Sequence, residues 1–416
     1  MKHRLKAVAL TLVVFGLFPF LSIAQLPKIF LQPKAPGNAK QSKFIDSIRF
    51  IPLEIKDDIN LQVYTNVQVT DKYFMLTDYN QKYFLLYGKD GRFVKKVSFK
   101  KFGDGFYPSF REVSNDIVFL GKNKNYAITA KDQIEVRLDW NNPKNKKYFR
   151  KYRLSLNDTT FTIKKAVPDE LDLIQAFSFH DDLYWQSNIT TSPLYKTKEE
   201  YEINIYKNDK LVRQYFPYDP VNEPRFQFAS ENANFSRTTS PSTQFVFRPF
   251  CDTIYKMVND SLFPAFHLVM PMENSLPPTF FTKPFKNKTE RENFERNNGW
   301  MFNQIYSFYE APDFYYLSVG FNSNYQDFVY EKQGNSTYKS KSVKADSSQY
   351  NLQLLTEFSV ESKSGNFYKP VKAGDLLTFF DQNKNAVVPK ELEEYLRRKP
   401  HAAAPVIVEF KFKEKP

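Results

Sequence analysis

Hydrophobic and polar residues alternate along much of this chain in short runs that end at turn-forming residues. In "YFLLYGKDGRFVKKVSF", residues 83–99, one alternating run precedes Asp90-Gly91 and a second follows it. A side-chain period of two is typical of a strand with one buried face. Asp-Gly between two such runs is a strong signal for a tight hairpin turn. This stretch therefore predicts a β-hairpin.

Looser copies of the same pattern recur along the chain. They lie at residues 126–138, 201–215, 254–268 and 314–338, the last around Gly334. The 42 Phe and 26 Tyr residues also favour strands, because aromatic side chains suit a pleated, half-buried surface. Hairpins repeated over a whole chain are typical of an array such as a propeller. We therefore expect an all-β fold.

Helix signals are few. The clearest is "PKELEEYLRR", residues 389–398, which begins with Pro389 and ends in two arginines, as the helix dipole prefers. A second is "TERENFERNN", residues 289–298. We expect both to be short helices that decorate loops rather than build a core.

The first 24 residues have the layout of a secretory signal peptide. A basic start precedes an almost wholly apolar run from Ala7 to Phe20, and Ser22-Ile23-Ala24 offers small residues for cleavage between Ala24 and Gln25. The alternative is an uncleaved membrane anchor, but the apolar run falls short of the roughly 20 residues that span a bilayer. No cysteine lies near the cleavage site. We expect a protein exported to the periplasm or the extracellular space, not a lipoprotein, with no transmembrane segment after cleavage.

The mature chain divides into two parts. Residues 25–43, with three prolines, are expected to form an extended leader. No linker rich in Gly, Ser or Pro follows, so residues 44–416 are expected to form one domain. A propeller must also bury the edges of its first and last blades. We therefore predict that residues 48–55, "IRFIPLEI", join the same blade as residues 406–412, "VIVEFKF".

Composition limits the chemistry. Cys251 is the only cysteine, so no intramolecular disulfide can form, and a free thiol is expected. With one cysteine and only His180, His267 and His401 in the mature chain, a structural zinc site is not expected. We predict no metal and no cofactor.

The chain is basic, with a formal charge of +13. Its densest basic run is "KNKKYFRKYR", residues 144–153, in which aromatic residues are interleaved. Such a run can bind single-stranded nucleic acid, but it can equally be a strand with one solvated basic face and one buried aromatic face. Export argues against nucleic acid. A solvated face is the favoured interpretation, and an anionic polymer or envelope surface is the next.

Several motifs, in their order, resemble those of bacterial secreted six-bladed β-propeller proteins. "IRFIPLEIKDD" is similar to the family's "IPLE" opening strand, and "YGKDGRFV" to its "F-D-x-x-G-x-F" hairpin. "FGDGFY" is a degenerate match to a "G-x-G-P-G-E-Y" loop. "CDTIYKMVNDSLFPAFHL" resembles a "D-x-I-Y" blade with its return strand, and "HAAAPVIVEFKFK" the terminal strand.

The resemblance runs from about residue 48 to 413 and implies a six-bladed β-propeller with short decorating helices. The chain departs from the family at the glycine loop, where Gly105-Phe106 replaces Pro-Gly-Glu, and at the tail, where Ala404 replaces Asn. The role of that loop's acidic residue is therefore open. We interpret the loop first as a sharp corner between blades, since glycine accepts such backbone angles cheaply. A ligand contact through Asp104 or Tyr107 is the alternative.

Candidate catalytic groups are sparse. His180 with Asp181 and Asp182 resembles a base with its carboxylates, but adjacent residues on a strand point to opposite faces. No histidine pairs with Cys251 by spacing. "DQNKN" at Asp381 imitates the start of a calcium loop but has Ala386 at the sixth position and Leu392 at the twelfth, so it is not an EF-hand.

Two functional classes remain. The first is a non-catalytic binding or assembly module whose propeller face or loops hold a glycan, a peptide or an envelope partner; Asp104, Tyr107 and Trp300 are the candidate contacts, because loops on a rigid scaffold often carry function. The alternative is a propeller hydrolase or lyase with carboxylates at the central channel, which rests on fold analogy. An anionic surface is a further possible partner, and nucleic acid is not expected.

Overall fold

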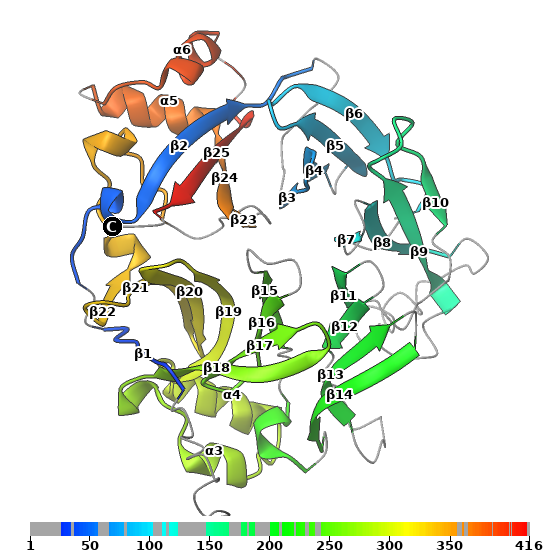
Figure 1. Ribbon diagram of the computed structural model, residues 1–416, viewed down its shortest axis with the longest axis vertical. Coiled ribbons are helices and arrows are strands. Elements are labelled where there is room, and N and C mark those ends of the chain that lie inside the picture. Colours follow the sequence, from blue (N-terminus) through cyan, green and yellow to red (C-terminus); the bar gives the residue numbers. More distant parts are fainter. Residues whose placement is uncertain are drawn as a thin grey trace, which may run out of the picture.

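A computed structural model describes most of the chain. The described residues are 26–34, 37–56, 66–78, 81–102, 110–113, 116–123, 147–165, 176–180, 183–187, 200–207, 210–219, 222–228, 233–237, 243–355, 360–361, 365–384, 386–398, 400 and 402–413. The described strands form six sheets that follow one another around a common centre, a propeller-like arrangement (Figure 1).

The sheets are named here from 1 to 6. Sheet 1 contains β3 (Asn66–Val69), β4 (Tyr73–Asp78), β5 (Tyr83–Gly88) and β6 (Phe93–Ser98). Sheet 2 contains β7 (Phe110–Val113), β8 (Asp116–Lys122), β9 (Phe149–Ser155) and β10 (Ile163–Lys165). Sheet 3 contains β11 (Ala176–His180), β12 (Leu183–Ser187), β13 (Glu200–Lys207) and β14 (Lys210–Tyr218).

Sheet 4 is five-stranded and contains β15 (Asn234–Arg237), β16 (Thr243–Phe247), β17 (Thr253–Val258), β18 (Ser261–Val269) and β1 (Lys28–Phe30). Sheet 5 contains β19 (Phe302–Glu310), β20 (Phe314–Phe321), β21 (Asn324–Glu331) and β22 (Ser336–Lys339). Sheet 6 contains β23 (Val360–Glu361), β24 (Asn366–Lys372), β25 (Pro405–Phe412) and β2 (Ile45–Pro52). Strand β7 contacts β11, β15 contacts β19, and β23 contacts β3, so neighbouring sheets meet through their first strands.

Most of the predicted hairpins are confirmed. Residues 83–99, 201–215 and 254–268 form β5–β6, β13–β14 and β17–β18, and β20–β21–β22 accounts for residues 314–338. Gly91 in the first turn has φ +84°, a left-handed conformation that glycine accepts without steric cost. The hairpin predicted at 126–138 lies outside the described residues.

The two ends of the domain close the ring together. Strand β2 pairs antiparallel with β25, with Ile48 opposite Phe410 and Phe50 opposite Val408. The predicted pairing of residues 48–55 with 406–412 is therefore confirmed. In Figure 1 the blue β2 and the red β25 lie side by side in one sheet. Pairing removes the free edge that each strand would otherwise expose.

The segment predicted as an extended leader is built into the fold. Strand β1 adds to sheet 4 in parallel, with Ile29 opposite Leu268. Ile29 and Leu31 are fully buried, whereas Phe30 between them is 42% exposed, because alternate side chains of a strand point to opposite faces. Hydrophobic burial of this alternating pair explains why the segment packs instead of trailing.

Four described α-helices fill connections. The pair α3 (Pro278–Thr282) and α4 (Lys288–Asn297) lies between sheets 4 and 5, and α5 (Ala373–Gln382) and α6 (Lys390–Arg397) lie between β24 and β25. The helices predicted at 289–298 and 389–398 are therefore confirmed as α4 and α6. The expectation that α6 only decorates a loop is wrong, because Leu392 and Leu396 are buried in the core shared by sheets 5 and 6. Within the part of the chain described, no helix is long and apolar enough to cross a membrane.

Candidate ligand pocket

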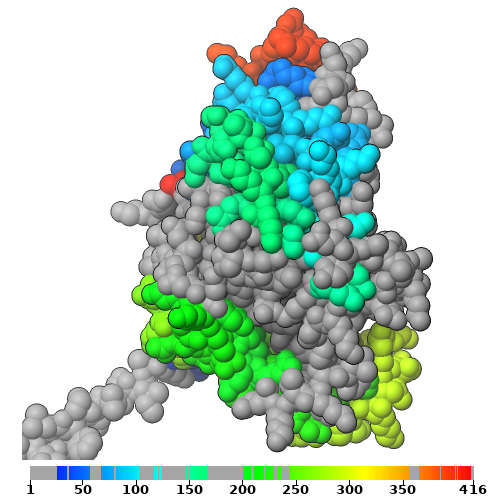
Figure 2. Space-filling view, turned by 90° about the vertical axis from the view of Figure 1, so that its right-hand side faces the viewer, coloured from blue at the N-terminus to red at the C-terminus, as the bar shows by residue number. Residues whose placement is uncertain are grey.

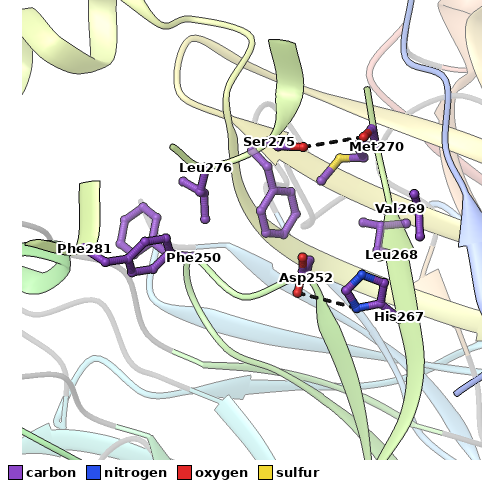
Figure 3. A pocket seen from close by; sticks show the side chains of 10 residues that line it. Phe250, Asp252, His267, Leu268, Val269, Met270, Ser275, Leu276 and Phe281 are labelled. Carbon is purple, nitrogen blue, oxygen red and sulfur yellow. Dashed lines mark hydrogen bonds and ion pairs between the residues drawn. The ribbon is translucent and has the colours of Figure 1, made fainter. Parts of the chain in front are cut away.

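A pocket of about 220 Å³ opens at one end of sheet 4. It lies where the connection between β16 and β17, the end of β18, and the chain leading to β19 meet (Figure 3). Its polar groups are Asp252, His267 and Ser275. The remaining lining is apolar and comprises Phe250, residues 268–270, Leu276, Phe281 and Phe302.

The register of the β17–β18 hairpin brings the acidic and imidazole groups together. A shift between Ile254 and Tyr255 places Thr253 opposite His267, so that Asp252, one residue earlier, lies beside the imidazole. The Asp252 Oδ1 and His267 Nδ1 atoms are 3.8 Å apart, and both side chains are partly exposed. Leu268 N–H donates to the Asp252 carbonyl at 2.8 Å, which holds the two segments in this register.

Ser275 lies at the opposite end of the pocket from His267 (Figure 3). It follows a 3-10 turn, η5 (Met272–Asn274), and its Oγ is 3.2 Å from the Pro271 carbonyl oxygen and 3.5 Å from that of Met270. The hydroxyl donates to these carbonyls and not to the imidazole. A serine nucleophile needs a base within hydrogen-bond reach, so Ser275 and His267 do not form a nucleophile–base pair here.

The apolar walls are rigid where they join the core and open at the rim. Phe250 and Phe302 are buried, whereas Phe281 on α3 is 39% exposed. Phe250 packs on Phe280 at 5.0 Å between ring centroids, and Phe280 packs on Phe281 at 5.3 Å, edge to face. Aromatic contacts of this kind fix ring orientation. The pocket is therefore largely preformed, and the partly exposed Phe281 side chain lies at its mouth.

Trp300 lies beside this pocket but does not line it. Its backbone carbonyl accepts a hydrogen bond from Asn274 Nδ2 at 2.8 Å, and its ring packs on Phe321 at 5.6 Å. The Lys34 ammonium lies 5.6 Å from the centroid of the Trp300 ring. Trp300 therefore supports the wall that carries Phe302, and its role as a ligand contact stays a prediction.

A buried ionic cluster holds the connection that carries Phe250 and Asp252. Glu202 of β13 is fully buried and bonds Arg225 of η4 (Pro224–Phe226) at 3.0 Å and Arg248 at 2.5 and 3.0 Å. Burial alone would lower the pKa of Arg248, but the hydrogen bonds and charge of Glu202 raise it overall. Arg248 stays charged, and its guanidinium also stacks on Phe216 at 3.8 Å.

Cys251 lies between these groups. It is a free thiol with partial exposure, and it hydrogen-bonds Tyr255. Burial first, and the neighbouring thiol second, raise the pKa of Tyr255. The half-buried Cys251 is thus a free thiol, as the sequence predicts.

The other candidates from the sequence do not converge on the pocket. Asp104, Tyr107 and the cleavage pair Ala24 and Gln25 lie outside the described residues. His180 ends β11, where its backbone pairs with Leu183. Asp381 lies in the last turn of α5 and pairs with Lys384 at 3.3 Å. Among the side chains that the structure describes, no group of three or more His, Cys, Asp or Glu could hold a metal ion.

The proximity of Asp252 and His267 was not predicted, although the sequence contains a pattern that indicates it. Both lie within "CDTIYKMVNDSLFPAFHL", a single hairpin around Asn259-Asp260. Counting pairs outward from that turn brings residues 252 and 267 close to one another. Ser275 and Phe281 carried no such signal, because they reach the pocket through an irregular connection.

A family model for a domain of unknown function, DUF4934, matches residues 28–411. The chain belongs to the DUF4934 family. The match covers all six sheets, including β1. No curated protein shows significant similarity to this DUF4934 chain.

Solved structures resemble the DUF4934 chain in fold. A candidate exported protein from Bacteroides fragilis is 14% identical, with 93% of this chain and 99% of that chain covered and a TM-score of 0.54. A DUF4221 family member from Bacteroides vulgatus is 10% identical over 89% of this chain and 97% of that chain, with a TM-score of 0.40. The first similarity shows a shared fold, and the second is too distant to do so.

Proposed function

We propose that this DUF4934 protein is an exported binding module, and that the pocket at the end of sheet 4 holds one sugar ring of a glycan. In this proposal the six sheets are the six blades of a closed propeller, which serves as the rigid scaffold. The observation that carries the proposal is the distribution of polarity in the pocket: apolar walls separate polar groups at its two ends.

A sugar ring matches this distribution. Its carbon-bound hydrogens form apolar faces that can pack on Phe250 and Phe281, and its hydroxyls project around the edge. Asp252 and His267 at one end can accept and donate hydrogen bonds to those hydroxyls. A purely apolar ligand, such as an aliphatic peptide side chain, would leave these polar groups without partners, and such desolvation is costly.

The size of the pocket also favours a single small unit. Its volume of about 220 Å³ is below the roughly 300–1,000 Å³ of pockets that enclose drug-sized ligands. A longer glycan would therefore place one ring in the pocket and run across the surface beside it. Trp300 flanks the pocket and is the proposed contact for the next ring.

Binding rather than catalysis is supported by the geometry of Ser275. Its hydroxyl donates to backbone carbonyls, and the imidazole lies at the other end of the pocket. The signal-peptide layout supports export, and a fold shared with a candidate exported protein agrees with it. Pairing of β2 with β25 supports a closed ring of six blades.

Calorimetric titration of the purified protein with a panel of oligosaccharides tests the proposal. Asp252→Asn should weaken binding by about tenfold or more, because a hydrogen bond to a charged group contributes about 1.5–3 kcal/mol. Asp381→Asn, an exposed carboxylate on α5, is the matched control and should leave affinity unchanged. Equal affinity of wild type and Asp252→Asn would exclude this pocket as the site. Turnover of a glycan, ester or lactone that Asp252→Asn abolishes would favour the hydrolase or lyase alternative.

A further inference from the structure

A second surface, on the outer side of sheets 1 and 2, carries a concentration of positive charge. It is called the basic rim here and consists of Lys95 on β6, Lys100 and Lys101 just after it, and Lys164 and Lys165 on β10. All five side chains are exposed. Figure 2 shows the segments of β6 and of β9–β10 adjoining on one face of the molecule.

The connection after β6 packs on sheet 2 and so links the lysines at the end of β6 to those of β10. The Phe102 ring lies 4.5 Å from the Tyr152 ring, and Lys122 N–H donates to the Phe102 carbonyl at 2.5 Å. Tyr152 on β9 is directly opposite Lys165 on β10. Lys101, which precedes Phe102, is thus brought beside the lysines of sheet 2.

The described strands around the basic rim carry few carboxylates. Strands β6, β9 and β10 contain seven Lys and Arg residues and no Asp or Glu. Lys95, Lys100 and Lys101 form no ion pair with any residue that the structure describes. Asp158 faces Lys164 from the β9–β10 turn, and Lys164 is directly opposite Arg153.

Two aromatic rings that the structure describes beside the basic rim are covered by other side chains. The Lys96 ammonium lies 4.5 Å from the centroid of the Tyr83 ring and covers it. Phe161 is buried and packs on Tyr73 at 5.8 Å. Exposed lysines next to an exposed apolar Val94, with these two rings covered, suit phosphate headgroups better than a glycan.

We propose that the basic rim docks onto a membrane surface rich in anionic phospholipid headgroups. Lysine ammonium groups contact such headgroups as point charges and need no fixed two-point geometry. The basic rim lies on the opposite side of the ring from β18 and α3, which border the ligand pocket (Figure 1). Docking would therefore hold the protein at a membrane while the pocket stays open. This inference does not depend on which ligand the pocket takes.

Co-sedimentation of the full mature chain with vesicles of phosphatidylcholine, with and without phosphatidylglycerol, tests the proposal. Binding is expected only to the vesicles that contain phosphatidylglycerol, and it should fall as the Debye length shortens to about 3 Å near 1 M salt. Each lysine neutralised should weaken binding about fivefold, so Lys95→Gln with Lys164→Gln should weaken it about 25-fold.

The matched control is Lys344→Gln with Lys390→Gln, which removes the same net charge from exposed sites outside the basic rim. The control pair should bind like the wild type, and thermal melts should show that both pairs fold. Equal loss in the two pairs would mean that net charge alone, not the basic rim, directs binding. Binding to a soluble polyuronate but not to the vesicles would identify an acidic glycan as the partner and overturn the membrane assignment.

Discussion

Glu202 of β13 accepts two hydrogen bonds from Arg248, which follows β16 in the neighbouring sheet. Glu202 is fully buried, and Arg225 shares it. This contact joins sheet 3 to sheet 4 and holds the segment that leads to Phe250 and Asp252. A buried ion pair need not add net stability, but removal of one partner leaves uncompensated charge behind.

Glu202→Gln should therefore lower the free energy of unfolding by about 3–5 kcal/mol, since the Arg248 guanidinium would lose its carboxylate, whereas Arg225 keeps its ion pair with Glu223. Urea denaturation followed by circular dichroism measures the change. Glu393→Gln, an exposed position on α6, should stay within about 0.5 kcal/mol of the wild type. A small effect at Glu202 would mean that the arginines find other partners.

Closure of the ring by β25 predicts that its core side chains are essential. Val408 is fully buried opposite Phe50, whereas Val387 is 72% exposed. Val408→Ala should lower the free energy of unfolding by about 2 kcal/mol through lost burial and a residual cavity, and Val387→Ala should change it little. Deletion of residues 405–416 should abolish cooperative unfolding altogether. An unchanged melting transition after the deletion would show that closure is dispensable.

Substitutions at two neighbouring positions of the N-terminal strand β1 should destabilise the protein to very different degrees. Ile29→Ala should destabilise the protein by about 2–5 kcal/mol, because Ile29 is fully buried between sheets 4 and 5. Phe30→Ala should be much milder, since Phe30 is 42% exposed. Thermal denaturation of the mature chain compares the two. Equal, small effects would mean that β1 does not stabilise the fold, as expected for part of an extended leader over residues 25–43.

The backbone conformation at residue 91 requires glycine. A Cβ at Gly91 would lie 2.3 Å from the Pro52 carbonyl oxygen, and its φ of +84° is unfavourable for other residues. Gly91→Ala should therefore destabilise the protein by more than about 1 kcal/mol. Gly334→Ala should be tolerated, because its Cβ would meet only the ends of two side chains, Ser336 Oγ at 3.2 Å and Glu331 Oε2 at 3.8 Å. Chemical denaturation of the two variants distinguishes the cases, and equal stability would contradict the contact with Pro52.

Asp346 links stability to pH. Partial burial on its own raises the pKa of Asp346, but hydrogen bonds from Ser348 and from the Ser42 N–H lower it overall. A carboxyl group with a lowered folded-state pKa contributes stability above its unfolded pKa of about 3.9 and loses it as pH falls through the folded value.

Asp346→Asn should accordingly reduce stability at neutral pH, and the difference from the wild type should shrink as pH falls below about 4. Denaturation midpoints measured from pH 7 down to about pH 2 check the slope. Asp381→Asn serves as the exposed control. A constant difference across this range would assign the effect of Asp346 to packing rather than to charge.

The sequence determined the local features of this protein. Alternating residues around Asp90-Gly91 and Asn259-Asp260 predicted hairpins, because side-chain period and turn chemistry act over a few residues. The pairing of residues 48–55 with 406–412 was also predicted, since an array of sheets must close its edges. The mostly-β, propeller-like class followed, while the count of six blades stays part of the proposed function.

Only the tertiary structure decided which distant residues meet. Helix α5 was missed although Leu376 and Phe380 have helical spacing, and its stability comes from packing in the core of sheets 5 and 6. Ser275 reaches the pocket of Asp252 and His267 through an irregular turn whose path no local pattern specifies. Burial of Glu202 between two arginines likewise depends on how adjacent sheets pack. Such contacts arise from packing between residues far apart in the sequence, which a local sequence pattern does not specify.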